Sequence, residues 1–138
     1  MATTIRANLS TNNKYYVPKH RYYELKHFCL QYKEWRKIYA SLLDIGLTVP
    51  YLESTRKSGV TDLTAKYASE RAYYSKRIRL IESTATDADP YLANYILQAV
   101  TENLSYTYLK SRLDVPCGKD MYYDRYRRFF WLLDKSRD

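Results

Sequence analysis

The sequence contains few of the residues that end regular secondary structure, with three glycines and four prolines among 138 residues. Sandwiches and barrels need many tight turns, in which these two residues are favoured, so their scarcity argues against an all-β fold. Long windows without either residue predict an all-α fold. A hydrophobic content of 46% suffices for a core in one domain or in two small helical lobes.

Cysteine and histidine are also scarce, with two of each. His20, His27 and Cys29 are close in sequence, but a metal site usually has closer pairs and more ligands. We therefore expect two surface histidines, a packed thiol, no metal ion and no cofactor. Cys117 stands beside Gly118 at an expected helix start, where a thiolate can be activated. No histidine or acidic residue is placed in sequence to make it catalytic.

Targeting and catalytic motifs are missing as well. Residues 1–17 hold no apolar run of signal-peptide length, and no window approaches a membrane span. We expect a cytoplasmic chain with reduced thiols and no membrane contact. The sequence has no phosphate-cradling glycine loop, no paired histidine–glutamate motif and no nucleophile elbow. We predict that the chain is not an enzyme.

Tyrosine and positive charge are abundant. The 17 tyrosines predict half-exposed aromatic seams, or a surface that stacks on bases or on a protein. The net charge is +8, and by segment it is +6 over residues 1–58, −1 over 59–104 and +3 over 105–138. Basic charge at both ends favours an acidic partner such as nucleic acid, although it also suits a solubilising surface.

The first two thirds of the chain predict a loose tail and a helical hairpin. Residues 1–17 are polar and are expected to be loose. A long antiparallel hairpin of coiled-coil character is predicted over 18–83, with helices at about 18–44 and 61–83 and a loop from Gly46 to Gly59. Thr61 is the expected N-cap of the second helix. Apolar residues at heptad spacing form the two seams: Leu25, Phe28, Tyr32, Trp35, Tyr39 and Leu42, and Val60, Leu63, Tyr67, Tyr74, Ile78 and Ile81.

The last third predicts a separate lobe over 89–138 with three helices. Residues 83–89 read as a polar connector, and Asp89-Pro90 as the N-cap and first residue of a helix that runs to about Asn103. Ser105 is expected to cap a short helix that ends near Asp114. The final helix is expected to start at about Lys119. Its buried face is predicted from 4, 3, 4 spacing: Tyr122, Tyr126, Phe129 and Leu133.

From Ser105 onward the chain carries a pattern close to a bacterial DNA-binding motif. Ser105-Tyr106 and Leu109 precede the turn Leu113-Asp114-Val115-Pro116, and Met121 follows. The positions expected to hold the two helices crossed are filled by apolar residues: Leu109, Leu113, Val115 and Met121. The stretch resembles the helix-turn-helix of small phage and mobile-element regulators of Gram-positive bacteria, of the RinA and ArpU type, which is similar to the promoter-reading end of sigma factors. The resemblance covers about residues 89–135. It departs from the pattern where Lys110 replaces a small residue, where Asp114 replaces the turn glycine, and where the turn is about one residue too long.

The resemblance implies a three-helix, helix-turn-helix-like lobe that binds duplex DNA and regulates transcription. It places Lys119, Asp120 and Tyr123, near the start of the last helix, against base edges. It places four basic residues against phosphates: Lys110, Arg112, Arg127 and Arg128.

Two alternatives stay open from the sequence. Asp120 and Asp124 would repel phosphate, and the arginines of the last helix can instead pair with them at helical spacing. The chain can also be a small phage-encoded inhibitor or adaptor that binds a host nucleic-acid enzyme, for example an anti-CRISPR protein, because basic, tyrosine-rich surfaces suit protein interfaces. In the DNA-binding interpretation, the 18–83 hairpin would form a homodimer or contact a protein partner.

Overall fold

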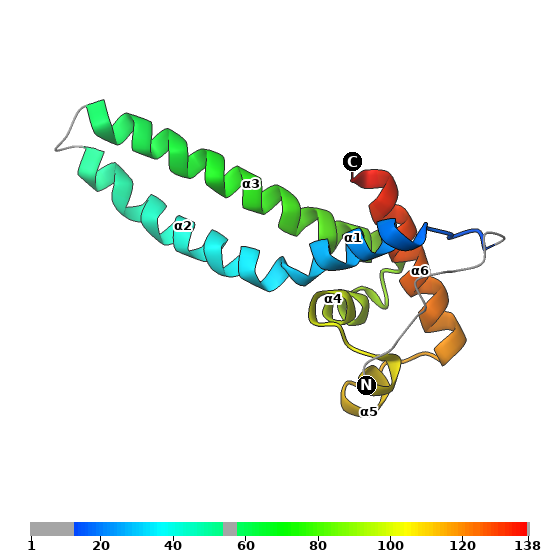
Figure 1. Ribbon diagram of the computed structural model, residues 1–138. Coiled ribbons are helices and arrows are strands. Elements are labelled where there is room, and N and C mark those ends of the chain that lie inside the picture. The colour runs from blue at the N-terminus through cyan, green and yellow to red at the C-terminus, as the bar shows by residue number, and fades with distance from the viewer. Residues whose placement is uncertain (1–12, 54–57, 138) are drawn as a thin grey trace. The chain divides into compact units, whose positions relative to one another are not determined.

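A computed structural model describes residues 13–53 and 58–137 of the chain, with side chains placed over 13–45 and 62–137. The described residues are all-α, as predicted, and contain no strand. None of their helices is both long and apolar enough to cross a membrane. The helices are α1 (Lys19–Leu30), α2 (Tyr32–Glu53), α3 (Ser58–Ala88), α4 (Ala93–Glu102), α5 (Tyr106–Arg112) and α6 (Lys119–Ser136) (Figure 1).

The chain divides into two compact units. Unit 1 combines residues 1–31 with 80–138, and unit 2 is the continuous stretch 32–79. The sequence predicted a hairpin over 18–83 and a lobe over 89–138. The structure instead groups α1 with α4, α5 and α6, since α1 contacts both α4 and α6.

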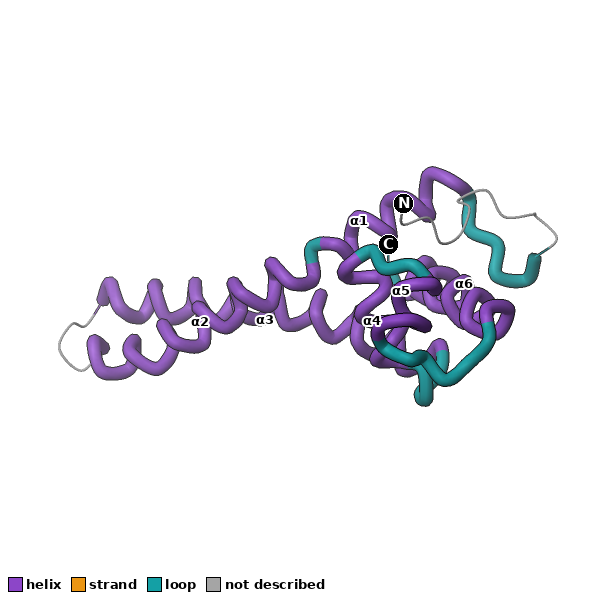
Figure 2. Tube along the Cα trace, turned by 90° about the horizontal axis from the view of Figure 1, so that it is seen from below, coloured by secondary structure: helices purple, strands orange, loops and turns teal. Residues whose placement is uncertain are grey.

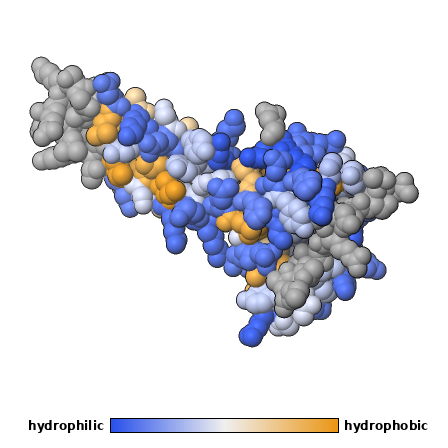
Figure 3. Space-filling view, in the orientation of Figure 1, coloured by the Kyte–Doolittle hydropathy of each residue, from blue (hydrophilic) through white to orange (hydrophobic). Residues whose placement is uncertain are grey.

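Unit 2 is a helical hairpin. α2 and the part of α3 up to Arg79 run side by side in opposite directions (Figures 1 and 2). On α2 the predicted seam residues Tyr32, Trp35 and Leu42 are buried. On α3 the seam residues Leu63, Tyr67 and Tyr74 are only half-buried, and Ile78 is buried. Apolar side chains also remain visible on the surface of the hairpin among hydrophilic ones (Figure 3).

Unit 1 is built around three helices that contact one another, α1, α4 and α6. The four α6 residues predicted to be buried, Tyr122, Tyr126, Phe129 and Leu133, are at most 3% exposed. This confirms the helical register inferred from their spacing. The same core contains further side chains that are almost fully buried: Leu25, Phe28, Cys29, Ile96 and Phe130.

Several helix boundaries differ from the prediction. The helix expected over 18–44 is interrupted at Gln31, whose N–H bonds to the carbonyl of Phe28, three residues back, at 3.3 Å. α2 then continues through Pro50 to Glu53, where a loop was expected. α3 begins at Ser58, before Thr61, and the predicted Thr61 cap and Val60 seam side chains lie outside those described.

The prediction of a polar connector over residues 83–89 is wrong, because α3 continues to Ala88. Thr84, Ala85 and Ala88 are buried, and the Thr84 hydroxyl donates to the Leu80 carbonyl at 2.6 Å. Although most residues of this stretch are polar, the ones that face inward are small. α4 then starts at Ala93, after a turn over residues 90–92, and not at Pro90.

Candidate nucleic-acid interface

The segment from Ser105 to α6 contains a capped helix followed by a tight turn. Ser105 caps α5, as expected, because its Oγ accepts from the N–H of Tyr108 at 3.1 Å. Leu109 and Val115 are fully buried. Asp114 has a φ of 51°, a left-handed conformation in which aspartate is tolerated better than most residues and glycine best. Asp114 therefore adopts the backbone conformation for which the pattern has a glycine.

Two other positions of the motif behave differently from the prediction. Met121 was expected to fill an apolar position between the helices, but it is 46% exposed. It precedes the buried Tyr122 by one residue, and one helical step turns a side chain by about 100° away from the core. Lys110 is exposed, and its ammonium donates to the Val115 carbonyl at 3.3 Å, so it does not stand between the helices.

The residues predicted to contact DNA all lie on α5 or α6. Lys110, Arg112, Lys119 and Asp120 are exposed, whereas Tyr123, Arg127 and Arg128 are half-buried. Tyr123 packs near the ring of Tyr106, with ring centroids 6.2 Å apart. Burial raises the pKa of Tyr123, and the charge of Arg127, one turn further along α6, acts in the opposite direction. Tyr123 and Arg127 therefore share one flank of α6.

Four arginines of unit 1 differ in whether a carboxylate holds them. Arg21 is held by Asp134 at 2.6 Å and by Glu24, and Arg125 is held by Asp89 at 3.0 Å and by Asp124. Arg127 and Arg128 form no ion pair with any carboxylate that the structure describes. Arg125 does pair with Asp124, but the two are adjacent in sequence and not at the helical spacing that was expected. The Nε of Arg127 is buried and has no hydrogen-bond partner in the described chain.

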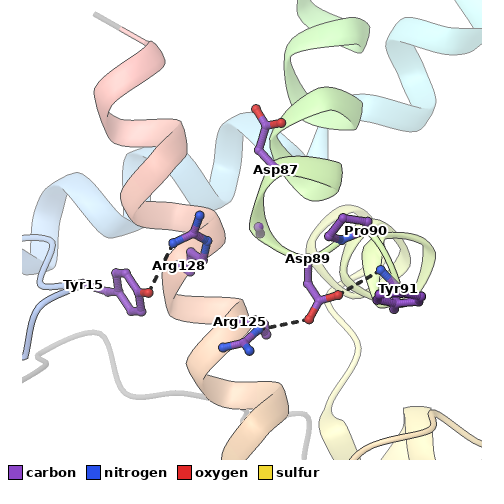
Figure 4. Close-up of a pocket in the computed structure, with 8 residues that line it drawn as sticks. Tyr15, Asp87, Asp89, Pro90, Tyr91, Arg125 and Arg128 are labelled. Carbon is purple, nitrogen blue, oxygen red and sulfur yellow. Dashed lines mark hydrogen bonds and ion pairs between the residues drawn. The ribbon is translucent and has the colours of Figure 1, made fainter.

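Arg128 lies beside an open pocket of about 490 Å³ in unit 1 (Figure 4). One Nη of Arg128 donates to the Tyr15 hydroxyl at 3.3 Å. The other lining residues include Asp87, Asp89 and Arg125. Because consecutive residues point about 100° apart around a helix, Arg128 and Arg127 serve different flanks of α6.

Asp89 fixes one wall of this pocket. Its Oδ1 accepts from the N–H groups of Tyr91 at 2.9 Å and Leu92 at 3.2 Å, and its Oδ2 accepts from the Nε of Arg125. The sequence indicated Asp89 as a helix cap, and it does cap the turn that leads into α4. Nothing in the sequence indicated its ion pair with Arg125, which is 36 residues away.

The segment before α1 covers part of the outer surface of α6. The Asn13 side chain accepts from the N–H of Tyr15 at 2.8 Å and so forms a local turn. Tyr15 is 8% exposed, and its ring centroid lies 5.5 Å from that of Trp131 on α6. Residues 13–17 were expected to belong to a loose tail, but Tyr15 and Val17 are part of the buried interior of unit 1.

The two thiols are less acidic than an ordinary cysteine, and the histidines lie on the surface. His20 and His27 are exposed and Cys29 is buried, as expected. Burial raises the pKa of both Cys29 and Cys117, which lowers the fraction of reactive thiolate at neutral pH. Cys117 therefore lacks the lowered pKa that a nucleophilic thiol at a helix start requires.

The fully buried hydroxyl of Tyr122 finds no hydrogen-bond partner in the described chain. Because an unsatisfied buried polar group is costly, Tyr122→Phe is expected to stabilise unit 1 by about 1 kcal/mol at neutral pH. Burial also raises the pKa of Tyr122. The unfolded chain then loses this proton first, so stability falls as the pH rises above about 10, and less so in the variant.

Urea unfolding at neutral and at alkaline pH measures both effects, with Tyr22→Phe as the control. The Tyr22 hydroxyl has a buried partner, Tyr126, at 3.1 Å, so its removal should lower stability at neutral pH. Equal destabilisation in the two variants would contradict the assignment of an unsatisfied Tyr122 hydroxyl.

Comparisons with known proteins identify no relative: no family model, no curated protein and no solved structure matches the chain.

Proposed function

We propose that the chain is a non-enzymatic, duplex-DNA-binding regulator of the phage or mobile-element type that acts in the cytoplasm. The observation that carries this proposal is the pair Arg127 and Arg128, two half-buried arginines without a carboxylate partner in the described chain, on a protein of net charge +8. Guanidinium groups are well suited to phosphate because several N–H donors point in one plane.

The surrounding residues support contact with a duplex. Lys119 and Tyr123 lie in the first half of α6, and Lys110 and Arg112 lie on α5, in the order expected for base-edge and phosphate contacts. A helix that lies between the two phosphate strands of a DNA groove can contact both strands if each flank carries a cation. Arg127 and Arg128 lie on different flanks of α6 and meet this requirement. By binding duplex DNA at a promoter, the protein would regulate transcription through recruitment or occlusion.

The decisive experiment is a salt titration of duplex DNA binding by fluorescence anisotropy, with native-locus and random sequences. Arg127→Glu with Arg128→Glu is expected to lower the affinity at least about tenfold and to flatten the salt dependence, because each phosphate contact contributes a slope of about 0.9. The control Lys19→Glu with Lys66→Glu changes the net charge equally at two exposed positions outside α5 and α6.

The proposal fails if the wild-type chain does not bind duplex DNA at low salt. It also fails if the α6 variant and the control bind equally well. Circular dichroism of each variant establishes that its helical content is unchanged.

A second candidate function is a protein-binding inhibitor or adaptor, of which an anti-CRISPR protein is one form. It is favoured by the exposure of Met121 (46%), Tyr108 (45%) and Tyr91 (91%), because exposed large apolar residues serve as interface anchors. The exposed carboxylate of Asp120 in the first turn of α6 also disfavours phosphate there. Tight capture of one host enzyme, together with the absence of DNA binding, would select this function.

A further inference from the structure

Two short stretches of unit 2 carry a large excess of basic over acidic residues. Residues 32–37 and 71–79 together contain seven basic residues and one acidic residue, which is +6 of the net charge of +8. We call the seven the basic cluster: Lys33, Arg36, Lys37, Arg71, Lys76, Arg77 and Arg79.

The hairpin brings the two stretches to the same end. Residues 32–37 are the first turns of α2, and residues 71–79 are the last part of α3 within unit 2. Because the two helices are antiparallel, the beginning of one lies beside the end of the other (Figures 1 and 2). Five of the seven residues are exposed, and Arg71 and Arg77 are half-buried.

Two arginines of the basic cluster are oriented by tyrosines of their own helices. Arg77 lies 3.5 Å from the ring centroid of Tyr73 and donates to the Tyr73 carbonyl at 3.1 Å. Arg36 lies 5.8 Å from the ring centroid of Tyr32 and donates to its hydroxyl at 3.1 Å. Each tyrosine stands four residues before its arginine, so both guanidinium groups lie over aromatic rings and lose less entropy on binding an anion.

The rest of the hairpin is not basic. Residues 38–70 contain four acidic and three basic residues, a net charge of −1: Asp44, Glu53, Asp62 and Glu70, against Arg56, Lys57 and Lys66. The positive charge is therefore localised at one end of unit 2 rather than spread over a solubilising surface.

We propose that the basic cluster is a second contact surface for the phosphate backbone of duplex nucleic acid, separate from the α6 arginines. The inference rests on the proposed DNA-binding function and locates a large share of the electrostatic affinity in unit 2. Binding of phosphates by these side chains would release counterions from the duplex, so the cluster would control the salt dependence while contributing little sequence preference.

The test removes three charges from the basic cluster in the full-length chain: Lys37→Gln, Lys76→Gln and Arg79→Gln. All three side chains are exposed, and the substitutions leave both tyrosine–arginine pairs intact. The matched control removes three charges elsewhere: Lys19→Gln, Lys26→Gln and Lys66→Gln. Anisotropy titrations with one labelled duplex at several salt concentrations compare both with the wild type and with the α6 variant.

The cluster variant is expected to lose about 2 to 3 from the slope of log affinity against log salt, because each phosphate contact contributes about 0.9. Its affinity should fall at least about tenfold, and the control should change by less than about threefold. A cluster variant that binds like the control overturns this inference, and if the α6 variant is weakened in the same experiment, the proposed function stands.

Two further outcomes are distinct from that one. If only the cluster variant is weakened, the inference is supported and the assignment of α6 as the DNA contact is overturned. If the wild type itself does not bind duplex at low salt, the proposed function and the inference both fail, and a protein partner for the basic cluster becomes the reading to pursue. Circular dichroism again verifies that the variants fold.

Discussion

Replacing Asp89 by alanine is expected to destabilise unit 1 by about 3 kcal/mol, because the carboxylate supports three interactions from a nearly buried position. Its side chain is 8% exposed. It accepts from two backbone N–H groups in the turn before α4 and from the guanidinium of Arg125 on α6. Alanine leaves both donors without that acceptor and leaves Arg125 with Asp124 alone.

Urea unfolding followed by tryptophan fluorescence and circular dichroism measures this effect, with Asp89→Asn as the matched control. Asparagine retains an oxygen for the two N–H groups but loses the charge that pairs with Arg125, so we expect it to cost about 1 kcal/mol. Equal losses for the two variants would assign all of the effect to the ion pair. A loss below about 1 kcal/mol for alanine would contradict the role given to Asp89.

The sequence predicted those parts of the fold that depend on helical periodicity. The buried face of α6 and the Ser105 cap of α5 are both as expected, because spacing and capping are local properties. The extension of α3 to Ala88 was missed because its inward residues there, Thr84, Ala85 and Ala88, are small or polar and give no apolar period. The placement of α1 within unit 1 depends on contacts with α4 and α6 that only the tertiary fold defines.

Only the location of the candidate site on the chain could be predicted, because it depends on a local sequence pattern. Its position on α5 and α6 followed from a local pattern, and the structure places the predicted residues on those helices. Which arginines are held by carboxylates could not be predicted, because Asp89 and Arg125 are separated by 36 residues. The concentration of basic residues at one end of unit 2 was also missed. Charges were counted over consecutive segments, which places residues 32–37 and residues 71–79 in different segments.

Replacing Tyr15 by alanine is expected to destabilise unit 1 by about 3 kcal/mol, the usual order for removing a buried aromatic ring. Tyr15 is 8% exposed, packs against Trp131 and is approached by the Lys14 ammonium 5.0 Å from its ring centroid. The prediction tests whether the segment before α1 is an integral part of the unit. Urea unfolding monitored by circular dichroism provides the measurement, and a loss below about 1 kcal/mol would show that the segment is dispensable.

Tyr15→Phe separates the packing of the ring from its hydrogen bond with Arg128. The ring is retained and only the bond to the guanidinium, 3.3 Å long, is lost, so the expected cost is about 0.5–1 kcal/mol. If Arg128 binds phosphate, this substitution should leave the DNA affinity unchanged or slightly higher, because one fewer partner competes for the guanidinium. A loss of affinity in Tyr15→Phe without a loss of stability would mean that the tyrosine hydroxyl itself orients Arg128 for binding.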